Sequence, residues 1–219
     1  MAVNRKLLTT SYLFSSLSDH DVGLVLAAAK PSTRAFRRGD VIWREGAVMD
    51  GLGVLEEGVL LFQRYHTDGK IQLARIHTPP DILNLEASVS RKKTSPATVA
   101  AATDGAYIWF THAGLFDNRA IPERTQRKIL MNLLSYLADD CIRFMNKSDI
   151  LSRRTVRERA MLFLGVLRAK QGDTVDTGMT QEEFAQYLCV DRSTLSNELN
   201  KMRKEGLIDF RGRKYTLHY

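Results

Sequence analysis

The chain has 219 residues, of which 44% are hydrophobic and 26% are charged, a balance that is ordinary for a globular protein and excludes gross disorder. Its formal net charge of +7 and pI of about 9.5 favour a polyanionic partner such as nucleic acid or an anionic membrane, although charge alone equally fits a basic soluble protein. The two cysteines lie far apart and outside any Cys-x-x-Cys pair, which argues against a disulfide framework or a structural zinc site and fits a reducing cytosol. No apolar run is long enough for a signal peptide or a membrane span, so we expect a cytoplasmic protein.

In the first half of the chain, the sequence pattern changes from helical to β-rich near Ser32. Residues 12–29 have the apolar spacing of a helix, with Ser18 placed to cap its second half. From 32 to about 110, short β-rich runs alternate with turn signals at a spacing typical of an antiparallel roll or barrel. Asp68-Gly69 predicts a hairpin turn between two of these runs.

Residues 123–147 predict a long helix with a heptad-like apolar seam. The seam consists of Leu130, Leu134, Leu137, Cys141 and Phe144. It can pack against its own β-roll, against a second copy of the chain, or against both, and the width of the apolar face favours a dimer. Ser148-Asp149 predicts a break, after which a second helix runs from about 153 to 170 and ends at Gly172.

The last 40 residues predict a helix-turn-helix. Thr180 followed three residues later by Glu183 has the pattern of a capping box, and it starts a short helix that ends at Leu188. Cys189 and Val190 then predict a tight turn, and Asp191 is placed to cap a second helix over 192–205. Two short helices joined by about three residues are typical of this DNA-binding motif.

The second of these helices has two different faces. Leu195, Leu199 and Met202 form a core stripe, whereas polar residues cluster at the N-terminal end on another side. Recognition helices place this end in the major groove, where Arg suits guanine and Asn suits adenine. Taken alone, the polar face equally fits a solvated face on an ordinary helix. The candidate base-reading residues are Arg192, Ser193, Ser196 and Asn197.

A basic hairpin follows directly and decides between these interpretations. Residues 207–210 and 215–217 predict two strands, and the turn between them carries Arg211, Arg213 and Lys214. Cations at this position are placed to meet phosphates, as the wing of a winged helix-turn-helix does. The combination of helix, turn, helix and basic wing therefore predicts binding to double-stranded DNA.

The whole layout resembles the Crp/Fnr family of bacterial transcription regulators. The resemblance rests on RRGDVIWREG (37–46), on TVRERAMLFL (155–164), and on MTQEEFAQYLCVDRSTLSNELNKMRKEGLI (179–208) with the following wing. It implies an α+β fold with an N-terminal antiparallel β-roll (a double-stranded, cupin-like β-helix), a long dimerisation helix and a C-terminal winged helix-turn-helix. The corresponding domains are an effector-sensing roll over 1–118, a dimerisation helix over 119–148 and a DNA-binding domain over 149–219.

The resemblance also implies how the protein acts. Family members bind a near-palindromic operator as homodimers, with half-sites one helical turn apart, and RNA polymerase is a further expected partner. By resemblance, Gln181, Thr194 and Arg213 occupy phosphate-contacting positions, and we add the wing cations Arg211 and Lys214. Effector binding between the roll and the dimer helix would reorient the recognition helices about a hinge near 147–152.

The chain departs from the cyclic-AMP-binding members where the nucleotide phosphate is held. Those members carry a Gly-Glu-Leu segment and, about ten residues later, Arg-Ser, whereas Asn84-Leu85-Glu86 and Ser95-Pro96 stand at the matching positions here. The phosphate-pairing arginine is absent, and Pro96 has no amide N–H to donate. The run Arg91-Lys92-Lys93 could substitute, but its simplest interpretation is a solvated loop. We therefore expect no cyclic AMP binding of the usual kind.

The effector consequently stays unidentified. The candidate pocket residues are Asn84, Leu85, Glu86, Ser95, Phe144 and Met145. Their partly apolar character permits an uncharged or aromatic effector, and it equally permits a pocket that side chains fill.

Other cofactors and activities are not expected. An iron–sulfur cluster needs several cysteines near the N-terminus, which this chain lacks, and His66, His77 and His112 are isolated candidates for haem ligands. No metal site and no catalytic residues are predicted, since the chain has no nucleophile elbow, HExxH motif or P-loop. The alternative function is a ligand-sensing protein that acts mainly through protein–protein contacts, and the basic wing and the Arg192/Asn197 pair argue against it.

Overall fold

The computed structural model of the chain describes residues 4–219. Contacts divide these residues into two compact units. The first extends to Gly69 and resumes over Ala74–Cys141, and the second comprises Lys70–Leu73 and Ile142–Tyr219. A single long helix, α5 (Glu123–Ser152), contributes to both units.

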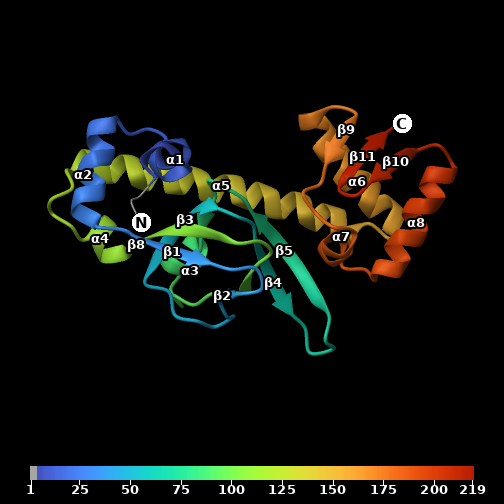
Figure 1. Cartoon of the computed structure of the whole chain (residues 1–219), viewed down its shortest axis with the longest axis horizontal. Helices are drawn as coiled ribbons and strands as arrows, with labels where there is room; N and C mark the ends of the chain where they lie inside the picture. Colours follow the sequence, from blue (N-terminus) through green and yellow to red (C-terminus); the bar gives the residue numbers. More distant parts are fainter. Residues whose placement is uncertain (1–3) are drawn as a thin grey trace. The chain divides into compact units, whose positions relative to one another are not determined.

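The elements of the N-terminal half, drawn in blue to green in Figure 1, are short strands together with several short helices. Their bounds are α1 Arg5–Thr10, the 3-10 helix η1 Tyr12–Phe14, α2 Asp19–Ala29, β1 Ser32–Phe36, β2 Val41–Trp43, β3 Gly51–Glu57, β4 Leu60–Tyr65, β5 Ile71–His77, β6 Ile82–Leu83, α3 Leu85–Val89, β7 Thr98–Ala101, β8 Gly105–Thr111 and α4 His112–Phe116.

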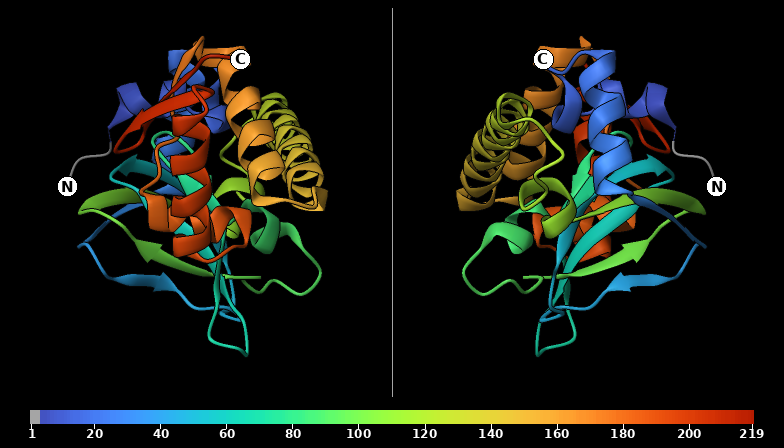
Figure 2. Two further views of the ribbon diagram at one scale, coloured as in Figure 1. Left: turned by 90° about the vertical axis from the view of Figure 1, so that its right-hand side faces the viewer. Right: turned by 90° about the vertical axis from the view of Figure 1, so that its left-hand side faces the viewer.

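The strands form two antiparallel four-stranded sheets, with orders β1-β8-β3-β6 and β2-β7-β4-β5. The predicted β-roll is therefore confirmed. The loop that joins β4 to β5 is the teal hairpin at the bottom of Figure 2, and its Gly69 has the positive φ that only glycine adopts freely. Gly105 is required for another reason: a Cβ there would lie 2.1 Å from the carbonyl oxygen of Glu57.

The sheet that contains β3 and β8 is buried on both faces. Along β8, Tyr107 and Trp109 point into the core shared with the other sheet, whereas Ile108 and Phe110 point into a second core. Because side chains alternate across a strand, such a two-faced strand appears as a continuous apolar run in the sequence.

The second core lies between this sheet, the N-terminal helices and the first half of α5. Ile129, Leu133 and Tyr136 of α5 are buried in it. The predicted helix over 12–29 is interrupted, because η1 ends at Phe14 and α2 starts after Ser18, whose hydroxyl caps it by accepting from the N–H of Asp21.

Helix α5 does not break at Ser148-Asp149, and that prediction is wrong. The helix continues to Ser152. Burial of the Ile150 side chain stabilises it here and offsets the low helix propensity of Ser148 and Asp149. An ion pair between Arg153 and Asp149, four residues apart with 2.7 Å between the charged atoms, joins the last turn to the residue that follows it.

The second unit contains a three-helix body and a small sheet of order β10-β11-β9. Its elements are α6 Val156–Gln171, β9 Thr174–Asp176, α7 Gln181–Leu188, α8 Arg192–Lys204, β10 Ile208–Arg211 and β11 Lys214–Leu217. Phe184 of α7 packs against Phe163 of α6 and Tyr215 of β11, with ring centroids 5.1 and 5.8 Å apart. One aromatic core therefore joins the helices to the wing.

Candidate DNA-binding surface

Helix α7 begins with the predicted capping box. The hydroxyl of Thr180 accepts from the N–H of Glu183 (3.2 Å), and the carboxylate of Glu183 accepts from the N–H of Thr180 (2.7 Å). Helix α7 ends at Leu188, and the C-cap residue Cys189 has the left-handed conformation (φ 56°) that turns the chain toward α8. The helix-turn-helix is thus fixed at both ends of its first helix by local interactions.

Helix α8 has the two faces that the sequence predicts. Leu195, Leu199 and Met202 are completely buried. The candidate base-reading side chains lie elsewhere: Arg192, Ser193 and Asn197 are exposed and Ser196 is half-buried. Asp191 occupies the N-cap position as predicted, but its side chain accepts no capping hydrogen bond.

A hollow of about 380 Å³ brings three elements of this unit together. It is lined by the start of α7, the start and end of α8 and the wing, through Thr180, Gln181, Arg192, Arg203, Phe210, Gly212 and Arg213. Three residues that the sequence singles out, Gln181, Arg192 and Arg213, therefore share one concave surface. Thr194, Arg211 and Lys214 are exposed in the same unit but do not line this hollow.

Arg203 is a functional candidate that the sequence pattern does not single out. Its guanidinium lies 3.7 Å from the centre of the Phe210 ring, donates to the carbonyl of Phe210 and pairs with Asp209 at 3.4 Å. These contacts attach the last turn of α8 to the wing. The only signal in the sequence is a cation followed seven residues later by an aromatic residue across the turn at Gly206.

Arg192 has one weak partner. Its Nε atom lies 3.9 Å from the carboxylate of Glu182, and both side chains are mostly exposed. Exposed pairs at this distance contribute little, so the Arg192 guanidinium is available to a ligand.

The candidate effector residues belong to two different units. In the first, Asn84 is buried in a left-handed conformation (φ 65°), and neither polar atom of its side chain has a hydrogen-bond partner. Leu85, the next residue, and Ser95 are also buried, and Glu86 is half-buried. Phe144 and Met145 belong to the second unit, where both are exposed.

The loop at Ser95 offers few donors. The Ser95 N–H donates to the carbonyl of Ala47 (2.9 Å), its hydroxyl donates to the carbonyl of Ala97 (2.7 Å), and Pro96 has no N–H. A phosphate at this loop would therefore have to compete for donors that the roll already uses.

The three histidines considered as haem ligands lie apart in the chain and differ in environment. His77 is buried, and its burial lowers the pKa of the imidazole. His112 packs against Phe116, with ring centroids 5.4 Å apart, and His66 lies in the hairpin between β4 and β5. Across residues 4–219, no three His, Cys, Asp or Glu side chains gather as a metal site.

The predicted seam lies on the face of α5 next to the core residues, and it is partly exposed. Leu130 and Leu134 are more than half exposed, Phe144 and Cys141 are exposed, and Leu137 is half-buried against the roll core. Within residues 4–219, no helix combines the length and the apolarity needed to cross a membrane.

Comparison with known proteins identifies the family. Residues 33–118 match the cyclic nucleotide-binding domain and residues 158–218 match the Crp-like helix-turn-helix domain. The chain belongs to the Crp/Fnr family. It is a transcription regulator with a helix-turn-helix DNA-binding domain, and members of this family regulate transcription rather than act as enzymes.

Individual relatives are distant. The chain is 23% identical over 195 residues to the transcriptional activator protein FnrL of Cereibacter sphaeroides, covering 84% of this chain and 75% of FnrL. Among solved structures, FixK2 from Bradyrhizobium japonicum has a TM-score of 0.64 at 19% identity, with 86% of this chain and 93% of FixK2 covered. The c-di-GMP-responsive global regulator CLP of Xanthomonas campestris has a TM-score of 0.74 at 15% identity, with 92% and 100% covered. These structures support the fold.

Proposed function

We propose that this Crp/Fnr regulator acts in the cytoplasm as a homodimer that reads a near-palindromic operator and works with RNA polymerase. Helix α8 would enter the major groove, where Arg192, Ser193, Ser196 and Asn197 would contact base edges. The observation that carries the proposal is the concave surface on which Gln181, Arg192 and Arg213 meet. A duplex seated there would meet a base-reading and a phosphate-contacting residue at once.

The phosphate contacts would come from both sides of the recognition helix. Gln181 and Thr194 would donate neutral hydrogen bonds, and Arg211, Arg213 and Lys214 of the wing would contribute charge. All three wing cations are exposed.

The homodimer would form along α5 through Leu130, Leu134, Leu137, Cys141 and Phe144. The support for this dimer is that one face of α5 is buried in its own roll, while the neighbouring face exposes large apolar side chains. In this arrangement, residues 1–118 are the effector domain, 119–148 the dimerisation helix and 149–219 the DNA-binding domain.

A small effector in the roll would control the switch, with Asn84, Leu85, Glu86, Ser95, Phe144 and Met145 as candidate contacts. We do not expect cyclic AMP, because Ser95 and Pro96 replace the phosphate-binding pair, nor an iron–sulfur cluster or haem, because the cysteine and histidine positions do not suit them. Calorimetric titration with cyclic AMP is expected to give no micromolar binding. Micromolar binding with one site per chain would contradict this part of the proposal.

In vitro selection from random double-stranded DNA tests the main proposal. We expect enrichment of a sequence with two inverted half-sites about 10 base pairs apart, centre to centre. Recovery of no preferred sequence at low salt would favour the alternative, a regulator that acts mainly through protein–protein contacts.

A further inference from the structure

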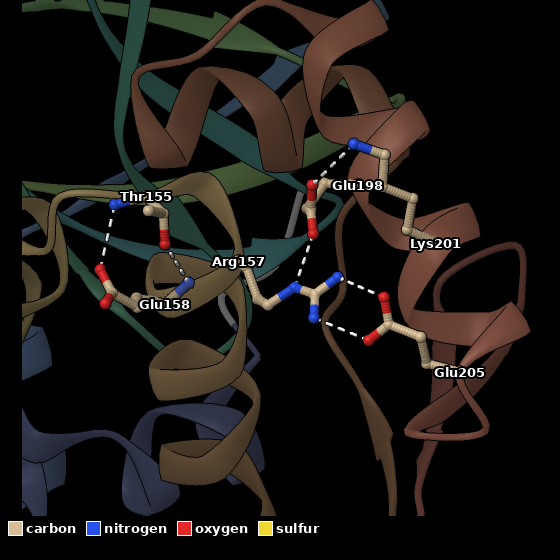
Figure 3. A network of polar contacts seen from close by, with 6 residues as sticks. All are labelled: Thr155, Arg157, Glu158, Glu198, Lys201 and Glu205. Atoms are coloured by element: carbon tan, nitrogen blue, oxygen red, sulfur yellow. Dashed lines mark hydrogen bonds and ion pairs between the residues drawn. The ribbon is translucent and has the colours of Figure 1, made fainter.

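Helix α6 begins with a second capping box, which fixes the direction of its first turn. The hydroxyl of Thr155 accepts from the N–H of Glu158 (3.2 Å), and the carboxylate of Glu158 accepts from the N–H of Thr155 (3.0 Å). These hydrogen bonds also hold the pKa of Glu158 below its usual value. Arg157 projects from this turn toward α8, as Figure 3 shows.

The guanidinium of Arg157 binds two carboxylates, that of Glu198 in the recognition helix and that of Glu205, the C-cap residue of this helix. Its Nε atom donates to Glu198 at 2.6 Å, and its two terminal nitrogens donate to the two oxygens of Glu205 at 2.7 and 2.8 Å. The pair with Glu205 is bidentate, the geometry that a guanidinium matches best and that restricts orientation most. Hydrogen bonding to Arg157 also lowers the pKa of Glu205.

The two glutamates are seven residues apart, so they lie on one face of α8 and span about 10 Å of its axis. Arg157 thus holds two turns of the recognition helix by one side chain. Glu198 directly follows Asn197, a candidate base-reading residue. A rotation of α8 about its axis would therefore break these hydrogen bonds and misdirect Asn197 together.

The arrangement also has an electrostatic consequence. Glu198 and Glu205 place two negative charges on the helix that approaches a polyanion. Arg157 offsets them from the protein side, and Lys201 adds a weaker pair with Glu198 at 3.8 Å. Without Arg157, both carboxylates would repel any duplex, whatever its sequence.

We propose that Arg157 is a positioning residue for operator selectivity, which keeps α8 at the angle where its base-reading side chains meet their bases without touching DNA itself. This proposal rests on the proposed role of α8. Arg157 would then contribute to DNA binding in two ways. By neutralising the two glutamates it strengthens binding to every duplex, and by fixing the orientation of α8 it strengthens binding to the operator alone.

Three variants separate these contributions. Arg157→Gln removes both contributions. Arg157→Gln with Glu205→Gln removes the clamp and leaves Glu198 paired with Lys201, so the charge of the cluster stays balanced. Arg168→Gln is the matched control, because Arg168 lies on the same helix and pairs with Asp173 at 2.6 Å, away from α8. The measurement is the dissociation constant of each purified full-length protein for the selected operator and for a random duplex, by fluorescence anisotropy.

For Arg157→Gln we expect weaker binding to both duplexes and a fall of about tenfold in the ratio of random to operator dissociation constants, the discrimination of roughly one base contact. The double variant should recover the wild-type affinity for random DNA while the ratio stays low. Its slope of affinity against salt should stay at the wild-type value, since its charge is balanced and Arg157 releases no counterion from DNA. Arg168→Gln should keep the wild-type ratio.

A folded Arg157→Gln protein with the wild-type ratio would overturn the proposal. So would a salt slope of the double variant that is reduced by about 1.8, which marks one phosphate contact of Arg157 in each copy of the dimer. If this variant does not fold, as judged by circular dichroism, Glu205→Gln carries the test through loss of the bidentate pair. A fall of about threefold in its ratio is then expected, and an unchanged ratio overturns the proposal. If the wild-type protein itself selects no operator, the proposed function of α8 fails, which is a different result from selection that survives loss of Arg157.

Discussion

Replacing Arg192 by alanine tests whether the start of α8 reads a base. In the free protein the side chain is 66% exposed, and its charge partner, Glu182, is 3.9 Å away and also mostly exposed. Such a pair contributes well under about 1 kcal/mol, so Arg192→Ala should leave the free energy of unfolding nearly unchanged. A guanidinium that binds guanine contributes about 1–3 kcal/mol of discrimination, and the dimer loses one such contact in each half-site, so the operator affinity should fall roughly 30-fold or more.

The assay is an anisotropy titration of the selected operator, of single-base variants at each position and of a random duplex. We expect the Arg192→Ala loss on the operator to disappear on the variant that changes the contacted base pair. Glu182→Gln is the matched control, since it removes the partner of Arg192 and leaves the guanidinium in place. It should bind the operator at least as well as the wild type.

Arg213→Ala should give the opposite pattern, because a phosphate contact carries no sequence information. Affinity should fall by a similar factor on all duplexes. The salt slope should decrease by about 1.8, because the dimer loses two phosphate contacts at about 0.9 each. If Arg192→Ala and Arg213→Ala lose affinity equally on the operator and on random DNA, then Arg192 does not read a base.

Two further variants probe the helix that links the units. Leu134→Glu should give a monomer in sedimentation experiments, because it places a charge in the proposed dimer seam. The unfolding of the roll should not change, because the Leu134 side chain is 58% exposed and lies outside the core of the roll. Arg127→Ala on the same helix should remain dimeric, and a dimeric Leu134→Glu protein would refute the seam. Lys147 is only 6% exposed, lies 3.9 Å from the centre of the Tyr187 ring, and has a pKa that burial lowers to about 8. Since the unfolded chain then binds more protons above this pKa, the unfolding free energy should be flat below pH 8 and rise by at most about 3 kcal/mol toward the ordinary lysine value near 10.5. Urea titrations of Lys147→Met should lack this rise, and a rise equal to that of the wild type would contradict the assignment.

The sequence predicts those features of the fold and the site that depend on near neighbours. The capping box at Thr180, the core stripe from Leu195 to Met202 and the basic hairpin each need only a few adjacent residues, and the structure has all of them. The β-roll is also predictable, since its turns carry glycines at a regular spacing. Each of these patterns reflects a local conformation that depends only on residues close together in the sequence.

The sequence does not predict contacts that depend on how distant segments pack. Arg157 and Glu205 are 48 residues apart, and no periodicity relates them. The end of α5 illustrates the same limit: Ser148 and Asp149 are poor helix formers, yet burial of Ile150 keeps the helix intact. Weak local preferences are overridden wherever a neighbouring side chain gains more from packing.

The charge of the C-terminal region shows why the contacts matter for function. Between residues 192 and 219 the sequence has seven Lys and Arg residues. If every one met a phosphate, a dimer would release about 14 counterions, and the logarithm of affinity would fall with that of salt at a slope of about −13 on B-DNA. The structure commits several of them elsewhere: Arg203 to Phe210 and Asp209, and Lys201 to Glu198.

The remaining cations set a much smaller slope. Arg192 is assigned to a base, and Gln181 and Thr194 are neutral and release no counterion. Arg211, Arg213 and Lys214 from each copy would neutralise about six phosphates per dimer, which gives a slope of about −5, or about −7 if Lys204 also takes part. Operator titrations between 50 and 300 mM salt measure this slope directly. A value near −13 would mean that Arg203 and Lys201 leave their partners to bind DNA, so that the wing is not held on α8 in the complex as it is in the free protein.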